Sequence, residues 1–381
     1  MRSYSTSFAF VLLMLAVLAL AGCGGRKDTA PLRIDTVVAE AQQRAFVDAL
    51  RPRRPGRPLV AVVALNEGTE ITDFLLTHGV LQRSGLVDVL AVAPRAGRVS
   101  LYPALEIDGA IDFAAFDAAH PAGADYVIVP AMKDTDDSRV LAWIRSQSMR
   151  GARVIAVCAG ALVAANAGLL DGRHFTTHWY YREELQKKHP RAIYVPNQRY
   201  LVDRGVATTT GITASVPTML ALVEAIGGPA RARTLADELG ASSWNPGHDS
   251  SRYGLAGRRW GYVRAKLAFW THHDWAVDVA DGTDDIALAF AVDAWSRTGR
   301  IDVTAAASVP VKLRSGIVLM AKRQDKDDPR VPLDAKLPAV QQLDRTLCDI
   351  RARFGEADRD RAMMELEYPD DGYSCPGVPG R

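Results

Sequence analysis

The feature that most constrains this chain is a short apolar run that ends at a cysteine and continues into a helix of small residues. Val154–Val157 is apolar and mostly β-branched, as expected of a buried strand. Cys158 follows directly, and residues 159–161 are small enough for a tight turn into a helix over Ala161–Ala167, which Gly168 ends. A thiol at such a corner points out of the sheet and lies near the positive end of a helix dipole, which favours the thiolate. The pattern therefore predicts a cysteine nucleophile.

A buried structural cysteine is the alternative, because free cysteine is among the most buried residue types. The next segment favours the nucleophile. Asp171-Gly172 predicts a turn and His174–Trp179 predicts a short strand, so the chain should return to the same end of the sheet. We therefore expect His178, twenty residues after Cys158, to lie beside the thiol and act as its base.

At these residues the chain resembles a known family. Gly168–Arg173 is Gly-Leu-Leu-Asp-Gly-Arg and Thr176–Trp179 is Thr-Thr-His-Trp, and both follow a cysteine and an alanine-rich helix as in the ThiJ/PfpI superfamily, which has the class I glutamine-amidotransferase-like fold. The resemblance is greatest to the amidase-like domain of AraC-type regulators and to isocyanide hydratases, and it covers roughly residues 58–240. It implies an α/β fold, namely a flavodoxin-like three-layer α/β/α sandwich with a mostly parallel sheet.

The first crossover of this domain should contribute an acid. The continuous apolar run Leu59–Leu65 predicts a central parallel strand, and Glu70–Ser84 predicts the helix that follows it. The resemblance implies a carboxylate in the first turn of this helix that reaches the cysteine, and Asp73 is assigned to that role. Glu67 and Glu70 are neighbouring acids, and a plain acid at a helix N-terminus is the alternative for Asp73.

The resemblance also implies an oxyanion site made of backbone amides. Relatives continue the strand before the crossover with Pro-Gly-Gly, whereas this chain has Pro130-Ala131-Met132. The amides of Ala131 and Ala159 are the expected donors.

A third acid that would orient His178 is not identified. Pro217 stands where relatives have an acid, and Asn197 and Asp203 are weak candidates.

The N-terminus predicts a lipoprotein signal peptide over residues 1–22. Phe8–Leu20 is an uncharged apolar run, short for a membrane span and suited to a signal peptide. Leu20–Cys23 resembles a bacterial lipobox, so Cys23 should be lipidated; a plain cleaved signal peptide or a retained anchor are the alternatives. Gly24 favours the outer membrane, with the domain facing the periplasm of a bacterial cell envelope.

Residues 23–58 predict a basic, proline-rich tether before a domain over 59–240. Arg51–Pro58 carries four arginines and four other residues that are proline or glycine, which disfavours regular structure. The tether should be a solvated stiff linker or lie on anionic lipid headgroups, and one helix is expected within Ile34–Leu50.

Residues 241–381 contain a partial repeat of the first crossover. Gly68-Thr69 matches Gly282-Thr283, and Arg83-Ser84-Gly85 matches Arg297-Thr298-Gly299 at the same spacing. We predict a C-terminal partial βαβ repeat from this match; chance similarity is the alternative.

The repeat, over residues 272–322, should be inactive. Ala287 occupies the position of Asp73, and no cysteine at a strand end follows it. Its expected role is to extend the sheet or to cover the first domain, before a helical tail.

The cysteines allow one disulfide. With Cys23 lipidated and Cys158 free, Cys348 and Cys375 remain, and a periplasmic location permits them to pair and to hold the C-terminal tail.

Composition excludes some functions. The net charge of +2 argues against an obligate nucleic-acid binder, and neither a metal-ligand cluster nor a phosphate-binding loop is found, so no metal and no cofactor are expected. The expected partners are a small-molecule ligand and, through the anchor, a membrane; a homodimer stays open.

The resemblance implies a cysteine-dependent hydrolase or hydratase that acts on a small amide, isocyanide or carbonyl compound. Cys158 would attack, Asp73 would position or protonate, and His178 would transfer a proton. A non-catalytic ligand- or partner-binding module and a cysteine redox or stress sensor are the alternatives.

Overall fold

The structure is a computed structural model, which describes residues 36–254, 273–323, 327–368 and 375. Its helices are α2 (Thr36–Ala49), α3 (Ile71–Ser84), α4 (Phe113–Ala119), α5 (Ser138–Met149), α6 (Gly160–Asn166), α7 (Arg182–Lys188), α8 (Ser215–Gly227), α9 (Pro229–Leu239), α11 (Asp285–Ser296), α12 (Gln341–Phe354) and α13 (Glu356–Leu366). Its strands are β1 (Leu59–Val63), β2 (Thr69–Glu70), β3 (Asp88–Ala93), β4 (Gly97–Tyr102), β5 (Glu106–Asp112), β6 (Tyr126–Val129), β7 (Arg153–Ala156), β8 (His174–Phe175), β9 (Ile193–Tyr194), β10 (Tyr200–Asp203), β11 (Val206–Thr209), β12 (His273–Asp278), β13 (Ile301–Ala306), β14 (Val311–Lys312) and β15 (Val318–Leu319).

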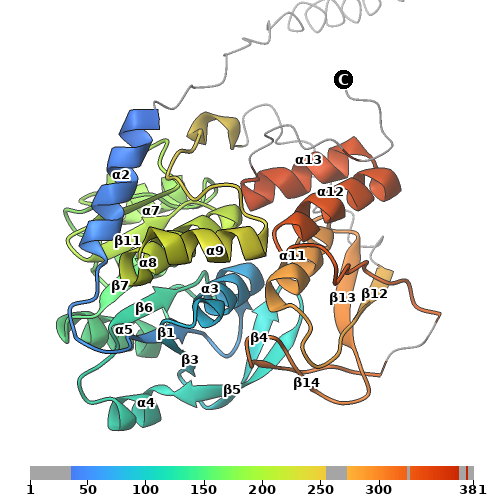
Figure 1. Ribbon diagram of the computed structural model, residues 1–381, viewed down its shortest axis with the longest axis horizontal. Coiled ribbons are helices and arrows are strands. Elements are labelled where there is room, and N and C mark those ends of the chain that lie inside the picture. The colour runs from blue at the N-terminus through green and yellow to red at the C-terminus, as the bar shows by residue number, and fades with distance from the viewer. Residues whose placement is uncertain (1–35, 255–272, 324–326, 369–374, 376–381) are drawn as a thin grey trace, which may run out of the picture. The chain divides into compact units, whose positions relative to one another are not determined.

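Among the described residues, eleven strands form the main sheet (Figure 1). The order is β10-β11-β7-β6-β1-β3-β5-β15-β14, with β4 paired to β5 and to β2. The central pairs β11-β7, β7-β6, β6-β1 and β1-β3 are parallel, whereas β10 and β15 are antiparallel to their neighbours. The sheet is therefore mixed and mostly parallel, as predicted.

Helices cover both faces of this sheet because the buried strands are apolar on both sides. In β1, Val60 and Val62 belong to one buried cluster, and Ala61 and Val63 belong to another. The first cluster includes residues of α3, α8 and α9, and the second includes residues of α4, α5 and α6. This arrangement confirms the predicted three-layer α/β/α sandwich.

The turn after β7 holds Cys158 in a left-handed backbone conformation, with φ 57. This conformation is uncommon for residues other than glycine, asparagine and aspartate. Gly160 makes the following turn possible, because a Cβ atom there would lie 2.0 Å from the carbonyl oxygen of Val129. The sharp corner predicted at Cys158 is therefore present, and two neighbouring strands fix it.

The segment after α6 returns to the end of the main sheet, as expected, but the strand predicted over His174–Trp179 was wrong in its length and does not pair with that sheet. Only His174–Phe175 is a strand, β8, and it pairs with β9 in a separate two-stranded sheet. Side chains hold the next residues across the end of the sheet instead: the Thr176 amide donates to Thr208 Oγ1 at 2.9 Å, and Thr177 Oγ1 donates to the Cys158 carbonyl at 3.0 Å.

The C-terminal half contains a βαβ unit at the predicted position. Strands β12 and β13 are parallel neighbours and α11 connects them. β15 pairs antiparallel with β5, so this half also extends the main sheet. The helix α11 packs on α3 (Figure 1), and buried apolar residues of both helices belong to one core cluster.

Residues 36–58 are part of the fold, and the prediction of a free tether over them was wrong. Helix α2 packs on α8 and β10 through Phe46, and the carbonyl of Leu50 accepts a hydrogen bond from the buried Tyr126 hydroxyl at 2.6 Å. Arg54 donates to the carbonyls of residues 122 and 123, and Arg57 donates to those of residues 85 and 87. The arginines therefore bind backbone carbonyls of this domain.

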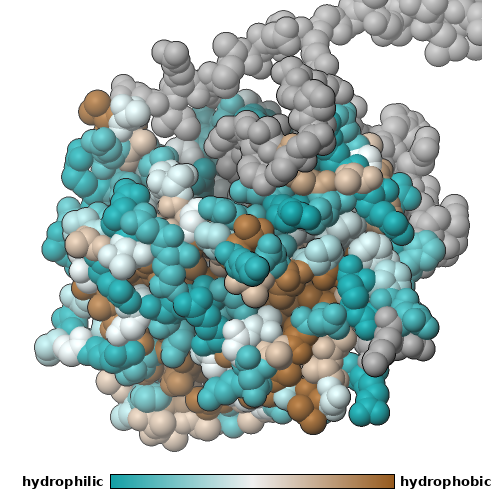
Figure 2. Space-filling model, turned by 45° about the vertical axis from the view of Figure 1, so that its right-hand side comes forward, coloured by the Kyte–Doolittle hydropathy of each residue, from teal (hydrophilic) through white to brown (hydrophobic). Residues whose placement is uncertain are grey.

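The signal peptide and Cys23 lie outside the described residues. None of the helices in the described part of the chain is long and apolar enough to span a bilayer. On the face drawn in Figure 2, hydrophobic residues gather mainly in the lower half, between hydrophilic ones.

Replacing Phe46 with alanine tests whether α2 belongs to the fold. Because this side chain is 1% exposed, Phe46→Ala should lower the free energy of unfolding by about 3–5 kcal/mol. The control Val38→Ala, on the same helix at 49% exposure, should change it by less than about 0.5 kcal/mol. Urea unfolding measures both, and equal small effects would contradict the packing of α2.

Candidate active site

Cys158 lies at the centre of a closed, acidic cluster. Its amide donates to Thr209 Oγ1 at 3.1 Å, and its side chain belongs to a residue that is only 5% exposed. Burial raises the pKa of the Cys158 thiol well above its usual value, and the nearby carboxyl groups of Asp73 and Glu70 raise it further. The Ala159 amide lowers this pKa, but by less. The predicted thiolate is therefore not the resting form, because burial outweighs the helix terminus.

Asp73 is the carboxyl group that shares this cluster with the thiol. It is 0% exposed in the first turn of α3, and its Oδ2 accepts a hydrogen bond from the Ala131 amide at 3.0 Å. Its Oδ1 is buried without a hydrogen-bond partner. Burial, and then the neighbouring Glu70, raise the pKa of Asp73 well above its usual value. A neutral carboxylic acid with one free oxygen can give or take a proton at this place.

Glu70 is a second buried acid, which the sequence did not separate from its neighbours. As the N-cap of α3, its Oε2 accepts the Asp73 amide at 2.7 Å and the Thr72 hydroxyl at 2.6 Å. Its Oε1 accepts Arg297 Nη2 at 3.0 Å. Burial and the charge of Asp293 raise the pKa of Glu70 to about 7 despite the arginine. Glu70 therefore links the start of α3 to the C-terminal half.

Two tyrosines also face the cluster. Burial raises the pKa of Tyr102, at the end of β4, and the charges of Glu70, Asp73 and Cys158 add to that rise. Burial raises the pKa of Tyr181 to about 12, and the charge of Cys158 contributes. Both hydroxyls are thus neutral neighbours of the thiol and can hydrogen-bond a small ligand.

His178 is buried near the cluster but is not paired with the thiol. Its Nε2 lies 2.9 Å from the carbonyl oxygen of Glu365, and its Nδ1 accepts the Tyr180 amide at 3.2 Å. These contacts fix the tautomer with a proton on Nε2. Burial lowers the pKa of His178 to about 4. The prediction that His178 hydrogen-bonds Cys158 as its base was wrong in this conformation, because both ring nitrogens are engaged elsewhere.

The C-terminal end of α13 closes the site. Glu367 accepts the Trp179 amide at 2.6 Å and the Gly211 amide at 2.9 Å, and it lies 3.4 Å from His248 Nε2. Burial raises the pKa of Glu367 to about 7. Burial also lowers the pKa of His248 to about 3, so the neutral pair is favoured over the ion pair. No sequence pattern marked Glu367, because it comes from the far end of the chain.

A cavity of about 180 Å³ lies beside α13. Its lining residues are Arg252, Tyr253, Arg359, Asp360, Met363, Met364 and Tyr368. Cys158, Asp73 and Glu70 are not among them, so in this conformation the thiol has no direct opening to that cavity.

Other predicted site residues lie elsewhere or are engaged. The Ala131 amide is bound by Asp73, so of the two expected oxyanion donors only Ala159 faces the sulfur. Asp203 binds His174 at 3.0 Å and Asn197 pairs with Ser250, so neither orients His178. Among the described residues, no group of three or more metal-ligating side chains is found.

Glu67, the other acid considered beside Asp73, is also not part of the cluster. It forms an exposed ion pair with Arg95 at 2.7 Å.

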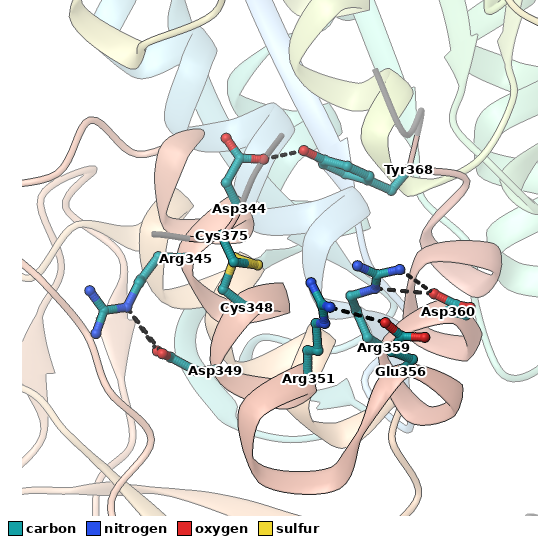
Figure 3. Close-up of a disulfide and its surroundings, with 10 residues drawn as sticks. All are labelled: Asp344, Arg345, Cys348, Asp349, Arg351, Glu356, Arg359, Asp360, Tyr368 and Cys375. Atoms are coloured by element: carbon teal, nitrogen blue, oxygen red, sulfur yellow. Dashed lines mark hydrogen bonds and ion pairs between the residues drawn. A yellow bond between two sulfur atoms is a disulfide. The ribbon is translucent and has the colours of Figure 1, made fainter. Parts of the chain in front are cut away.

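Cys348 and Cys375 form a disulfide, as the sequence allowed (Figure 3). It joins α12 to a residue of the tail. Figure 3 also shows the Tyr368 hydroxyl directed at Asp344 of α12, with which it hydrogen-bonds. Both links hold the chain just after α13 against α12, next to the end of α13 that closes the site.

Glu367 should make the free energy of unfolding depend on pH. Its pKa of about 7, against 4.5 for the solvated group, means that the folded state holds a proton more tightly than the unfolded state. The stabilisation is fully present below 4.5 and is lost as pH rises through about 7. Glu367→Gln removes this titration, so its free energy of unfolding relative to wild type should rise by up to about 3 kcal/mol between acidic and alkaline pH.

Urea unfolding on both sides of this window measures the change. A pH-independent offset is expected as well, because the glutamine amide cannot accept every hydrogen bond that the carboxylate accepts. Glu356→Gln, at an exposed position of α13, is the matched control and should show no comparable change with pH. A constant difference between Glu367→Gln and wild type across the window would contradict the raised pKa.

Parts of the chain are similar to known proteins. Residues 60–225 match the DJ-1/PfpI family. Isonitrile hydratase of Pseudomonas putida is 37% identical over 94 residues, which cover 24% of this chain and 40% of that protein. The HTH-type transcriptional regulator CdhR of Pseudomonas aeruginosa is 30% identical over 123 residues, 31% of this chain and 36% of the regulator. GlxA of Rhizobium meliloti, another HTH-type transcriptional regulator, is 28% identical over 200 residues, 51% and 59% of the two chains.

These matches span between 36% and 59% of the length of the relatives. Among solved structures, a THiJ/PfpI family protein from Pseudomonas syringae is 24% identical with a TM-score of 0.42, covering 48% of this chain and 74% of that one. Drosophila melanogaster DJ-1beta is 21% identical with a TM-score of 0.44, covering 49% and 100%.

Proposed function

Residues 60–225 form a domain of the DJ-1/PfpI family, and on that premise we propose that this protein is a cysteine-dependent hydratase or hydrolase of a small, uncharged electrophilic compound, such as an isonitrile, an amide or a carbonyl compound. The observation that carries this proposal is a strained, buried Cys158 close enough to Asp73 for that carboxyl group to raise the pKa of the thiol, together with the second carboxyl oxygen of Asp73, which is buried without a hydrogen-bond partner. The relative named isonitrile hydratase supports this substrate class.

The chemistry of the cluster favours an uncharged substrate. Burial keeps both the thiol and the Asp73 carboxyl in their neutral forms, and the remaining charges nearby are mostly acidic. An anion would be repelled, and a strongly hydrated cation would lose its water in a closed site. A small apolar electrophile is neither repelled by the acidic groups nor strongly hydrated, so it can enter without these costs.

For an isonitrile the steps balance as follows. Sγ of Cys158 attacks the terminal carbon, the thiol proton passes to Asp73, and Asp73 gives a proton to that carbon, which yields a thioimidate. Water then adds, with its oxygen going to the carbon and a proton going to the nitrogen. Cleavage of the C–S bond releases the formamide, and the hydroxyl proton of the adduct returns to the sulfur. Asp73 acts as both acid and base in this sequence, and His178 is not required.

A non-catalytic role is favoured by one observation. Nε2 of His178 binds the carbonyl of Glu365, and the carboxyl group of Glu367 accepts the Trp179 amide, so both contacts hold the end of α13 near the cluster. A ligand- or partner-binding module would need no open route to the thiol, and two relatives are transcriptional regulators. A redox sensor is disfavoured, because oxidation follows thiolate character and exposure, and Cys158 lacks both.

Substitution of Cys158 and Asp73, with Asp203 as a control, tests the catalytic proposal. Cys158→Ser should abolish turnover of small isonitriles and amides, and Asp73→Asn should reduce it about 10²–10⁴-fold because proton transfer is lost. Asp203→Asn is the matched control, since Asp203 binds His174 and should leave turnover unchanged. Formamide or ammonia release measures each reaction. Undiminished turnover in Cys158→Ser would reject the enzyme and leave the binding module.

We further propose that Cys23 carries a lipid and that the domain faces the periplasm. The sequence Leu20-Ala21-Gly22-Cys23 after an apolar run supports this location. A disulfide between Cys348 and Cys375 is also at home in an oxidising compartment. The lipid anchor and the catalytic function are independent proposals.

Cell fractionation tests the anchor. Wild type should sediment with the membranes, predominantly the outer membrane, and Cys23→Ser should lose lipid labelling and no longer be held there by an acyl chain. Cys158→Ser is the control and should fractionate as wild type does. Lipid labelling that persists in Cys23→Ser would exclude Cys23 as the modified residue.

A further inference from the structure

Two buried ion pairs between α3 and α11 mirror each other. Arg83 of α3 binds Asp284 at 2.6 Å, and Arg297, just after α11, binds Glu70 at 3.0 Å. In the sequence repeat, Arg83 matches Arg297 at the same spacing that relates Glu70 to Asp284. Each arginine therefore contacts the acid at the matched position of the other copy. This exchange of contacts is the signature of a two-fold interface between like units.

The helix pairs beyond α3 and α11 repeat the same relation. α8 and α9 pack on α3, and α12 and α13 pack on α11 (Figure 1). Gly228 joins the first pair with φ 83 and ψ 169, and Gly355 joins the second with φ 91 and ψ 176. The two halves of the chain thus share more structure than the repeat found in the sequence.

The ends of these helix pairs also exchange contacts. The carbonyl of Leu239, at the end of α9, accepts the Val340 amide at the start of α12 at 3.0 Å. In the opposite direction, Glu367 at the end of α13 accepts the Gly211 amide and the Thr213 hydroxyl before α8, at 2.9 and 2.6 Å. The C-terminal half is therefore docked on the first as a second subunit of a symmetric dimer would be.

The chemistry of the two halves is not symmetric. Ala287 stands at the position of Asp73, and Cys158 has no counterpart in the described part of the second half. Arg83 therefore faces only Asp284 and Asp285, whereas Arg297 faces the acids beside a thiol.

Arg297 is connected to the reacting groups through Glu70. It binds Glu70 Oε1, and the other carboxyl oxygen of Glu70 holds the amide of Asp73 at 2.7 Å. Its guanidinium also binds Asp293 at 2.8 Å and Glu365 at 3.4 Å, with its side chain 18% exposed. It is thus the cation that offsets a cluster of buried carboxyl groups.

We propose that Arg297, delivered by the C-terminal half in the manner of a partner subunit, is a positioning residue that fixes Glu70 and Asp73 and sets the charge around Cys158. The inference rests on the proposed function of that site. The titratable and charged groups around the site come from β2, α3, β4, the segment before α7, α11 and α13 with the residues that follow these two helices: Glu70, Asp73, Tyr102, His178, Tyr181, Asp293, Arg297, Glu365 and Glu367.

The alkylation of Cys158 by iodoacetamide, followed against pH in the full chain by peptide mass spectrometry, tests this role. Removing the positive charge makes every acid of the cluster harder to ionise, so Arg297→Met should move the midpoint of the alkylation profile up by about one pH unit. Arg297→Lys keeps the charge and should stay close to wild type. The readout follows one peptide, so Cys23 does not contribute.

Arg83→Met is the matched control, because it removes the mirror-related ion pair without touching the cluster. It should lower stability to urea in a similar way and leave the alkylation midpoint within about 0.2 pH units of wild type. An unchanged midpoint in Arg297→Met, or an equal shift in Arg83→Met, would overturn the proposal. If Arg297→Met does not fold, Arg297→Lys provides the test. An alkylation midpoint in Arg297→Lys that differs from wild type by about one pH unit would also overturn the proposal. The assay needs no turnover, so it can succeed even where no tested isonitrile or amide is a substrate.

Discussion

The structure depends on the burial of several carboxyl groups around one thiol and one guanidinium. Glu70, Asp73 and Asp293 are each 2% exposed or less, and Arg297 is the cation that contacts two of them. Such burial is costly unless charges are paired or neutralised. The pairing ties α3 to α11, and the neutralisation gives Cys158 neighbours that hold protons at neutral pH. Stability and chemistry thus share one set of side chains.

This constraint changes what the thiol can do. A cysteine at a helix N-terminus is usually expected to ionise easily, but burial and two nearby acids oppose ionisation of Cys158. A neutral thiol beside a neutral carboxylic acid suits an addition in which attack and protonation are coupled. It suits oxidation or attack on a charged substrate poorly. Glu367 strengthens the effect, because its charge also raises the pKa of Cys158.

Local patterns in the sequence predicted two central strands and the corner that holds the thiol, whereas the three-layer fold followed from the family resemblance. The apolar runs at β1 and β7 identified the strands, and small residues after Cys158 identified the turn. The acid at Asp73 followed from a family resemblance, and the structure places it in the same cluster. The position of His178 was not predictable, because a carbonyl of α13, far along the chain, binds its ring.

The residues from the C-terminal half show most clearly which contacts could not be predicted from the sequence. Arg297 matched Arg83 in the repeat, but nothing local indicated that it would reach Glu70, because that contact depends on how α11 packs on α3. The prediction of a free tether over residues 36–58 was wrong for a related reason. Their arginines and prolines are typical of a solvated linker, yet the carbonyls at the edge of the domain accept the arginine N–H groups. In both places, hydrogen bonds between residues far apart in the sequence determine the structure.

The central claim is that Asp73 carries a proton next to a neutral Cys158 at neutral pH. Infrared difference spectroscopy between wild type and Asp73→Asn, with Glu70→Gln and Glu367→Gln for assignment, observes the carbonyl band of a protonated carboxylic acid directly. The account predicts such a band in wild type at neutral pH, assigned to Asp73 because Asp73→Asn alone removes that component. A wild-type spectrum in which Asp73 contributes only carboxylate bands would contradict it.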